Sequence, residues 1–130
     1  MNHILKKYCP RIEFDSYEDF YENFKIDVPE AFNFGFDVVD EWARVEPEKR
    51  ALVWCDDHDH ERTFTFTDLS RLSNRAANAF SKLGIGKGDV VMMILRRRWE
   101  YWVCAVALCK LGATIIPASL QLTKKDIAYR

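Results

Sequence analysis

The 130-residue sequence lacks several features that mark special classes of protein. It has no uninterrupted apolar run of about 18 residues, the length that a helix needs to cross a bilayer. It has no excess of positive charge, because 19 Lys and Arg face 20 Asp and Glu, and this balance disfavours nucleic acid as a partner. Its first residues, MNHILKKYCPRIEFD, contain no apolar core of a secretory signal. We therefore expect a cytoplasmic chain with neither a membrane span nor a nucleic-acid partner.

The cysteines and histidines form no recognisable disulfide or catalytic pattern. The four cysteines are irregularly spaced, and Cys104 and Cys109 fall in an apolar helical stretch where a free cysteine packs as a small hydrophobe. We expect reduced, structural cysteines, since the alternative of a disulfide framework is typical of shorter, secreted chains. The only histidines are His3, His58 and His60, and no serine lies in a G-x-S-x-G elbow. The sequence therefore predicts no catalytic residue in this chain.

What the sequence has is apolar content, 48% of its residues, which is enough to build a core for one domain or part of one. A first short helix is predicted after Ser16, which forms a capping-box-like start with Asp19. Four aromatic residues then follow at helical spacing, Tyr17, Phe20, Tyr21 and Phe24. After Pro29, a second helix is predicted over about residues 36–45.

Two strand-like runs, RALVWCD and RTFTFTD, flank the polar cluster DHDHE and predict an antiparallel hairpin. Thr67 is the predicted N-cap of the helix that follows. The apolar residues of this helix repeat with helical period up to Gly84, where a left-handed C-terminal glycine is expected.

The stretch LGIGKGDVVMMIL, residues 83–95, places three glycines at alternate positions and could be a phosphate-binding loop. Such a loop needs a strand before it and a helix after it, so that the helix N-terminus faces the anion. Here the order is reversed. We interpret the glycines as a helix cap and a tight turn that lead into a buried strand over residues 90–95.

An apolar helix is predicted over residues 99–111, ending at Gly112, and TIIPA follows as a strand. Strand, helix and strand in this order make a parallel βαβ unit, and the apolar first strand favours a sheet covered on both faces. The predicted fold class is therefore α/β, with an antiparallel hairpin beside a parallel portion.

Thr123 and Asp126 form a second capping box only a few residues before Arg130, so we expect an N-terminal piece of a longer protein.

Three groups of residues are candidates for a site. Residues 55–61, CDDHDHE, contain every common type of metal ligand, but polar turn residues are equally expected there and we favour that interpretation. Arg96, Arg97 and Arg98 follow the carboxyl end of a predicted parallel strand, where α/β sheets place ligands. They either bind an anion or form a solvated helix start paired with an acidic group. The aromatics Trp99, Tyr101 and Trp102 are predicted to be core residues rather than a stacking platform.

Four stretches taken in order resemble the N-terminal segment of AMP-forming acyl-CoA synthetases, which belong to the adenylate-forming enzymes. They are FNFGFDVVDEWA, FTFTDLSRLSNRAANAFSKLGIGKGDVV, LRRRWEYWVCAVALCKLGATIIP and LQLTKKDIAYR. Within that superfamily, they look most like the medium-chain and acetyl or propionyl type. The resemblance implies an N-terminal helical extension over residues 1–32. It also implies that residues 33–130 are an incomplete, N-terminal part of the AMP-binding domain, truncated before the phosphate loop.

The resemblance further implies an activity for the whole enzyme. A carboxylic acid is activated with ATP and Mg²⁺ to an acyl-adenylate, and coenzyme A then takes the acyl group. The phosphate loop of that family, rich in Ser, Thr and Gly and ending in Pro-Lys-Gly, occurs nowhere in these residues. We therefore expect this chain alone to be inactive, to bind none of these cofactors, to need the rest of its polypeptide and to self-associate. No metal-binding residue is predicted.

One position matches a ligand-binding residue of the family. Gln121 aligns with a glutamine that is associated with coenzyme A, although a loop amide bonded to nearby backbone is an equal alternative. The rival to an enzyme segment is a self-contained α/β module that binds another protein. Benzoate-type, luciferase-like and peptide-synthetase adenylation domains also remain open, because the acyl pocket lies outside these residues.

Overall fold

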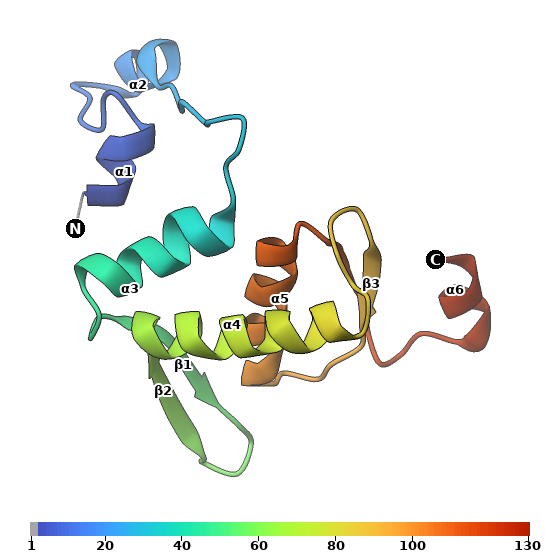
Figure 1. Ribbon diagram of the computed structural model, residues 1–130. Helices are drawn as coiled ribbons and strands as arrows, with labels where there is room; N and C mark the ends of the chain where they lie inside the picture. The colour runs from blue at the N-terminus through green and yellow to red at the C-terminus, as the bar shows by residue number, and fades with distance from the viewer. Residues whose placement is uncertain (1–2) are drawn as a thin grey trace. The chain divides into compact units, whose positions relative to one another are not determined.

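The computed structural model describes residues 3–130, which divide into two compact units at the boundary between Phe32 and Asn33 (Figure 1). The first unit holds α1 (His3–Tyr8) and α2 (Tyr17–Asn23). Ser16 caps α2 as predicted, because its Oγ accepts a hydrogen bond from the Asp19 backbone N–H at 3.1 Å. The Asp19 carboxylate accepts from the Asp15 backbone N–H and the Arg11 guanidinium, so it does not complete the predicted box.

The aromatic stripe of α2 divides in two. Phe20 and Phe24 both pack edge-on against Phe14, with ring centroids 5.3 and 6.3 Å from it. Tyr17 and Tyr21 are exposed. No residue of α2 is fully buried, so this helix depends on its cap and on a small aromatic cluster.

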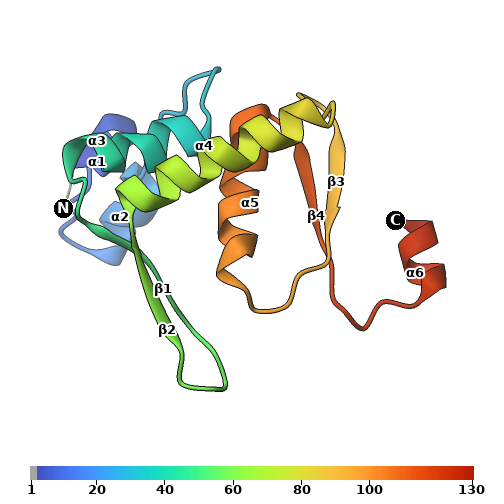
Figure 2. The same cartoon turned by 60° about the horizontal axis from the view of Figure 1, so that its bottom comes forward.

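The second unit begins with a helix in the predicted place, but its first part is a π-helix. This π-helix, η1 (Gly35–Asp40), runs directly into α3 (Glu41–Val45). The hairpin β1 (Arg50–Cys55) and β2 (Glu61–Thr65) follows and is antiparallel, as predicted, with Val53 opposite Thr63. It projects from the start of α4 (Phe66–Lys82) in both Figure 1 and Figure 2.

The predicted cap of α4 was wrong by two residues. Thr65, not Thr67, is the N-cap, and it forms a reciprocal capping box with Asp68. Thr67 lies inside the first turn, and its hydroxyl donates to the Pro47 carbonyl at 2.9 Å. The β-type run RTFTFTD concealed the boundary, because Phe66 continues the strand pattern in sequence yet begins the helix.

The parallel βαβ unit is confirmed. It consists of β3 (Val90–Met93), α5 (Trp99–Leu111) and β4 (Thr114–Pro117), and β3 pairs with β4 from Val90 opposite Thr114 to Met93 opposite Pro117. Figure 2 shows the two strands side by side with α5 alongside them. The glycine run is a turn, with Gly84 (φ 86°) just after α4, and Gly112 (φ 71°) ends α5 in the left-handed conformation. The last helix is α6 (Lys124–Tyr129), capped by Thr123 and Asp126 as predicted.

The core of this unit lies between η1, α4 and α5. It is built from Val39, Leu69, Val103 and Val106, and α5 also buries Leu108 completely. Two predictions about burial were wrong. β3 is shorter than predicted and not covered on both faces, since Val90 is 60% exposed, and Trp102 is 53% exposed rather than in the core.

Candidate functional site

A cavity of about 950 Å³ opens beside the carboxyl ends of the two parallel strands. Three loops line it: the tip of the hairpin, the β3–α5 connection, and the segment after β4. Gln121 and the three consecutive arginines, Arg96–Arg98, are all part of its wall. The two candidate ligand-binding groups of the sequence therefore meet in one place.

The parallel pairing explains why these groups meet. β3 ends at Met93 and β4 at Pro117, and these two residues are opposite each other in the register. The chain leaves both strands at the same edge, so residues 95–98 and 119–121 emerge together. This is the edge at which open α/β sheets bind ligands.

The arginine loop is held by its backbone and not by its side chains. The Trp54 indole Nε1 donates to the Arg97 carbonyl at 2.7 Å, and the Arg98 N–H donates to the Arg96 carbonyl at 2.6 Å. All three arginines are exposed, and none of the ion pairs or side-chain hydrogen bonds among residues 3–130 involves their guanidinium groups. The predicted alternative of pairing with an acidic group of this chain is therefore not observed in the part of the chain that the structure describes.

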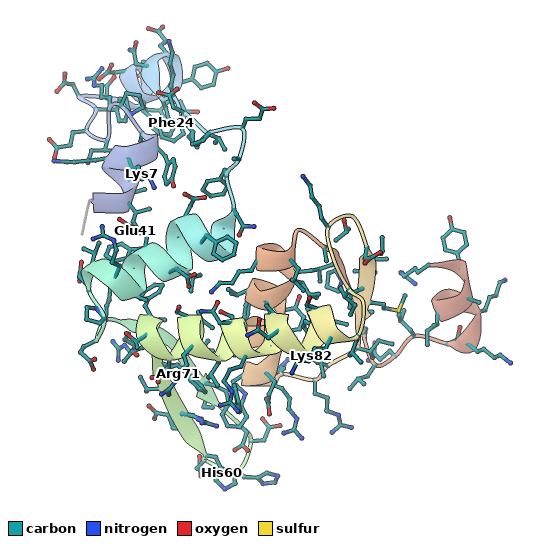
Figure 3. The ribbon with its side chains drawn as sticks, viewed as in Figure 1. Lys7, Phe24, Glu41, His60, Arg71 and Lys82 are labelled. Atoms are coloured by element: carbon teal, nitrogen blue, oxygen red, sulfur yellow. The ribbon has the colours of Figure 1, made fainter. Side chains whose placement is uncertain are left out.

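The hairpin tip, where Figure 3 places His60, forms a second wall of the cavity. The Asp56 carboxylate accepts hydrogen bonds from the backbone N–H groups of His58 and His60, and lies 2.9 Å from Nδ1 of His60. The His60 ring is the main cause that lowers the pKa of Asp56 to about 2, and the two backbone bonds add to it. These polar residues thus satisfy one another as a turn, and residues 3–130 contain no group of three His, Cys, Asp or Glu that could hold a metal ion.

Gln121 is exposed in the third wall. Its backbone N–H donates to the Ser119 hydroxyl at 3.1 Å. None of the hydrogen bonds that the described residues make uses its side-chain amide. The amide is therefore available to a ligand, and the proposed local bond to backbone is not observed.

A smaller cavity of about 390 Å³ shares the arginine loop and adds three aromatic residues to its wall. Trp54, Tyr101 and Trp102 line it, and the last two rings meet edge to face at 5.3 Å. Trp54 was not predicted as a site residue, because a tryptophan in a strand is usually a core residue. Its indole N–H, a donor that needs a partner, is the signal that could have identified it.

The cysteines are unpaired. Burial raises the pKa of the Cys104 and Cys109 thiols, which keeps them protonated and supports their expected packing role. Cys55 differs from them, because it is exposed and lines both cavities.

Comparison with known sequences identifies the family to which residues 39–130 are similar, described as AMP-binding enzyme. The mitochondrial acyl-coenzyme A synthetase ACSM3 of Mus musculus is 38% identical over 123 residues, which are 90% of this chain and 21% of that protein. The mitochondrial acyl-coenzyme A synthetase ACSM5 of Homo sapiens is 38% identical over 109 residues, 79% of this chain and 19% of that protein. The chain thus spans about a fifth of the length of these curated relatives.

Solved structures give the same result. A Mycobacterium tuberculosis fatty acyl CoA synthetase has a TM-score of 0.66 and 28% identity over 75% of this chain and 18% of that one. The N-terminal subdomain of Klebsiella oxytoca NpsA has a TM-score of 0.62 and 25% identity over 71% of this chain and 23% of that one. None of the helices within residues 3–130 is long and apolar enough to span a bilayer.

Proposed function

Because this chain belongs to the AMP-binding enzyme family, we propose that it is part of an acyl-CoA synthetase. Such an enzyme activates a carboxylic acid with ATP to an acyl-adenylate and transfers the acyl group to coenzyme A. The observation that carries this proposal is the family match over residues 39–130, supported by relatives that are named acyl-coenzyme A synthetases at 38% identity. We further propose that residues 1–32 are an extension and that residues 33–130 are the first part of the AMP-binding domain.

The residues of this chain fit coenzyme A better than they fit ATP. The side-chain amide of Gln121 can both donate to and accept from an amide of the pantetheine arm. The Ser/Thr/Gly-rich phosphate loop with which that family holds ATP does not occur in this chain. We therefore assign this segment a role in binding coenzyme A and none in the adenylation step.

The experiment replaces Gln121 with alanine in the protein that carries this chain. Loss of one neutral hydrogen bond corresponds to roughly 0.5–1.5 kcal/mol, so the apparent affinity for coenzyme A should fall about two- to tenfold. Adenylation, measured by pyrophosphate exchange, should not change. Thioester formation at varied coenzyme A concentration reports the second half-reaction.

A matched control is Asn78→Ala, which removes another exposed amide, on α4 and outside the cavity. It should alter neither half-reaction. If Gln121→Ala lowers both half-reactions together, Gln121 supports the fold; if it changes neither, the coenzyme A assignment is wrong. An absence of both activities in the parent protein would instead contradict the synthetase proposal itself.

The cellular location stays a prediction. The first residues of the sequence predict a cytoplasmic protein, whereas the curated relatives are named as mitochondrial proteins. Fractionation of cells that express the protein from its own gene, followed by detection in the cytosolic and mitochondrial fractions, distinguishes the two locations.

A further inference from the structure

We propose that Arg96, Arg97 and Arg98 bind the phosphate groups of coenzyme A in the cavity that also exposes Gln121. The inference rests on the proposed function, since coenzyme A is the substrate that it assigns to this cavity. It adds a second set of ligand-binding residues, on a different loop and with a different chemistry. The two loops lie at the carboxyl ends of paired strands, so a single ligand can contact both.

The three arginines carry charges that no described residue pairs. The three guanidinium groups form no ion pair among the described residues, although the first unit and α4 pair their own exposed arginines Arg11 and Arg71 with carboxylates. A guanidinium presents a planar fork of donors that matches a phosphate with two parallel hydrogen bonds. Three adjacent forks in one loop suit a ligand with several phosphate oxygens.

The loop is also positioned before any ligand arrives. The Trp54 indole fixes the Arg97 carbonyl from the hairpin, and Arg98 is the N-cap of α5 without a side-chain cap bond. The arginine side chains are therefore free to point at a ligand while their backbone is held. Cations at a helix N-terminus oppose the helix dipole, so without an anion the arrangement is unfavourable.

Acidic residues limit where the phosphates can lie. Asp56 and Asp57 line the same cavity from the hairpin tip, and they partly offset the three positive charges. The Asp56 carboxylate is already bonded to His60 and to two backbone N–H groups. Glu100, in the first turn of α5, has one carboxylate oxygen buried without a partner. The phosphates therefore belong on the β3–α5 loop, away from the hairpin tip, with the neutral amide of Gln121 beside them.

This combination of groups selects the ligand class. Coenzyme A joins a phosphate-rich nucleotide to an arm with two amides, and the cavity joins guanidinium groups to a free side-chain amide. ATP carries the phosphates without the arm, and pantetheine carries the arm without the phosphates. The cavity, about 950 Å³, lies within the range of small-molecule sites.

The test titrates the 130-residue chain with coenzyme A, ATP and pantetheine at low ionic strength, and follows tryptophan fluorescence and calorimetric heat. Trp54 lies in the cavity wall, so occupation of the cavity should change its emission. The sequence alone predicted no bound cofactor, but the cavity that unites the arginines with Gln121 changes this expectation for coenzyme A. We expect weak binding of coenzyme A, with a Kd above about 100 μM, that weakens further as salt screens the arginines. ATP and pantetheine should each bind more weakly than coenzyme A.

Single variants Arg96→Gln, Arg97→Gln and Arg98→Gln should reduce coenzyme A binding, with at least one loss of about three- to tenfold. Pantetheine binding should not change in any of them. Arg75→Gln is the matched control, because it removes an exposed arginine from α4 outside both cavities. It should bind coenzyme A as the unmodified chain does.

Several results overturn the inference: no binding at about 5 mM coenzyme A, equal binding in all arginine variants, or ATP binding as tight as coenzyme A binding. If the parent protein lacks synthetase activity but this chain binds coenzyme A through the arginines, the proposed function is wrong and the arginine site is supported. An active synthetase whose coenzyme A affinity is unchanged by replacement of all three arginines would support the proposed function and contradict the arginine site.

Discussion

Lys110 is the most deeply buried charge of the described chain, and its surroundings explain how it is tolerated. Its side chain is 2% exposed, and Nζ donates to the Asp40 carboxylate at 2.6 Å and to the Asn74 side-chain oxygen at 2.7 Å. The Ser70 hydroxyl donates to the same Asp40 oxygen at 2.6 Å. A buried ammonium needs such partners, because a lone charge out of water is strongly unfavourable. The network joins η1, α4 and α5, so it fixes how these helices pack.

Gly35 provides the space that this lysine needs. A Cβ at this position would overlap Cγ of Lys110, and the lysine cannot move aside because both ends of its side chain are held. We predict that Gly35→Ala lowers the free energy of unfolding by about 1–2 kcal/mol, since overpacking outweighs the gain in helix propensity. Urea denaturation followed by circular dichroism measures the loss.

Gly86→Ala is the control for that prediction. A Cβ at Gly86 meets no atom within 4 Å, and the backbone there is not left-handed. Its unfolding free energy should stay within about 0.5 kcal/mol of the unmodified chain. Equal stability of the two variants would show that Lys110 has room to move and that the packing argument fails.

At the scale of elements, the start of α4 depends on one hydroxyl. Thr65 Oγ1 accepts a hydrogen bond from the Asp68 backbone N–H at 3.1 Å, and the Asp68 carboxylate accepts one from the Thr65 backbone N–H. We predict that Thr65→Ala destabilises the chain by about 1 kcal/mol, whereas Thr65→Ser, which keeps the hydroxyl, has a much smaller effect. Thermal melts of both variants and of Thr67→Ala would measure this. A larger loss of stability in Thr67→Ala than in Thr65→Ala would instead support Thr67 as the cap, as the sequence predicted.

The hairpin tip should lose stability in acid. The pKa of Asp56 falls from its ordinary value of 3.8 to about 2 in the folded chain, mainly through its bond to His60. A carboxyl whose pKa is lower when folded stabilises the fold above its unfolded pKa and loses that effect as the pH falls through the folded one. The melting temperature should therefore be lower in Asp56→Asn than in the unmodified chain at pH 6, and the two should converge between about pH 4 and 2.

Asp57→Asn is the control for the acid series. Asp57 is the adjacent exposed carboxyl, and none of the hydrogen bonds among the described residues involves its side chain. Its melting curve should follow that of the unmodified chain at every pH. A constant difference between Asp56→Asn and the unmodified chain from pH 6 to pH 2 would mean that the carboxylate charge is not the cause.

The elements show what sequence patterns can predict and what they cannot. Periodicity and glycine caps located α4 and α5, and the alternation of strand and helix gave the parallel pair, because these signals are local. The π-helix η1 escaped prediction, and so did the packing of Gly35 against Lys110, because the two residues are 75 positions apart in the chain. The arginines and Gln121 were separate candidates in sequence. Only the register of β3 and β4 places them in one cavity.

At the scale of the whole molecule, the second unit exposes large apolar and aromatic side chains. Six of these residues are more than half exposed: Phe36, Leu83, Val90, Trp102, Leu120 and Tyr129. The parallel sheet has two strands in the described residues, so each strand has one unpaired edge there. Unpaired strand edges and exposed apolar groups favour association with other chains.

We therefore predict that the 130-residue chain self-associates. Light scattering at about 100 μM should give an average mass well above the 15.3 kDa of one chain and a mass that falls on dilution. The double variant Val90→Lys with Trp102→Lys should shift the chain toward the monomer, because it places charge on the β3 edge and on the exposed face of α5. Asn78→Lys is the control, since it adds charge at an exposed polar residue of α4, and it should associate as the unmodified chain does. A chain that is monomeric at every concentration and melts in one sharp transition would contradict this prediction, because it would show that the second unit is stable with these apolar groups exposed.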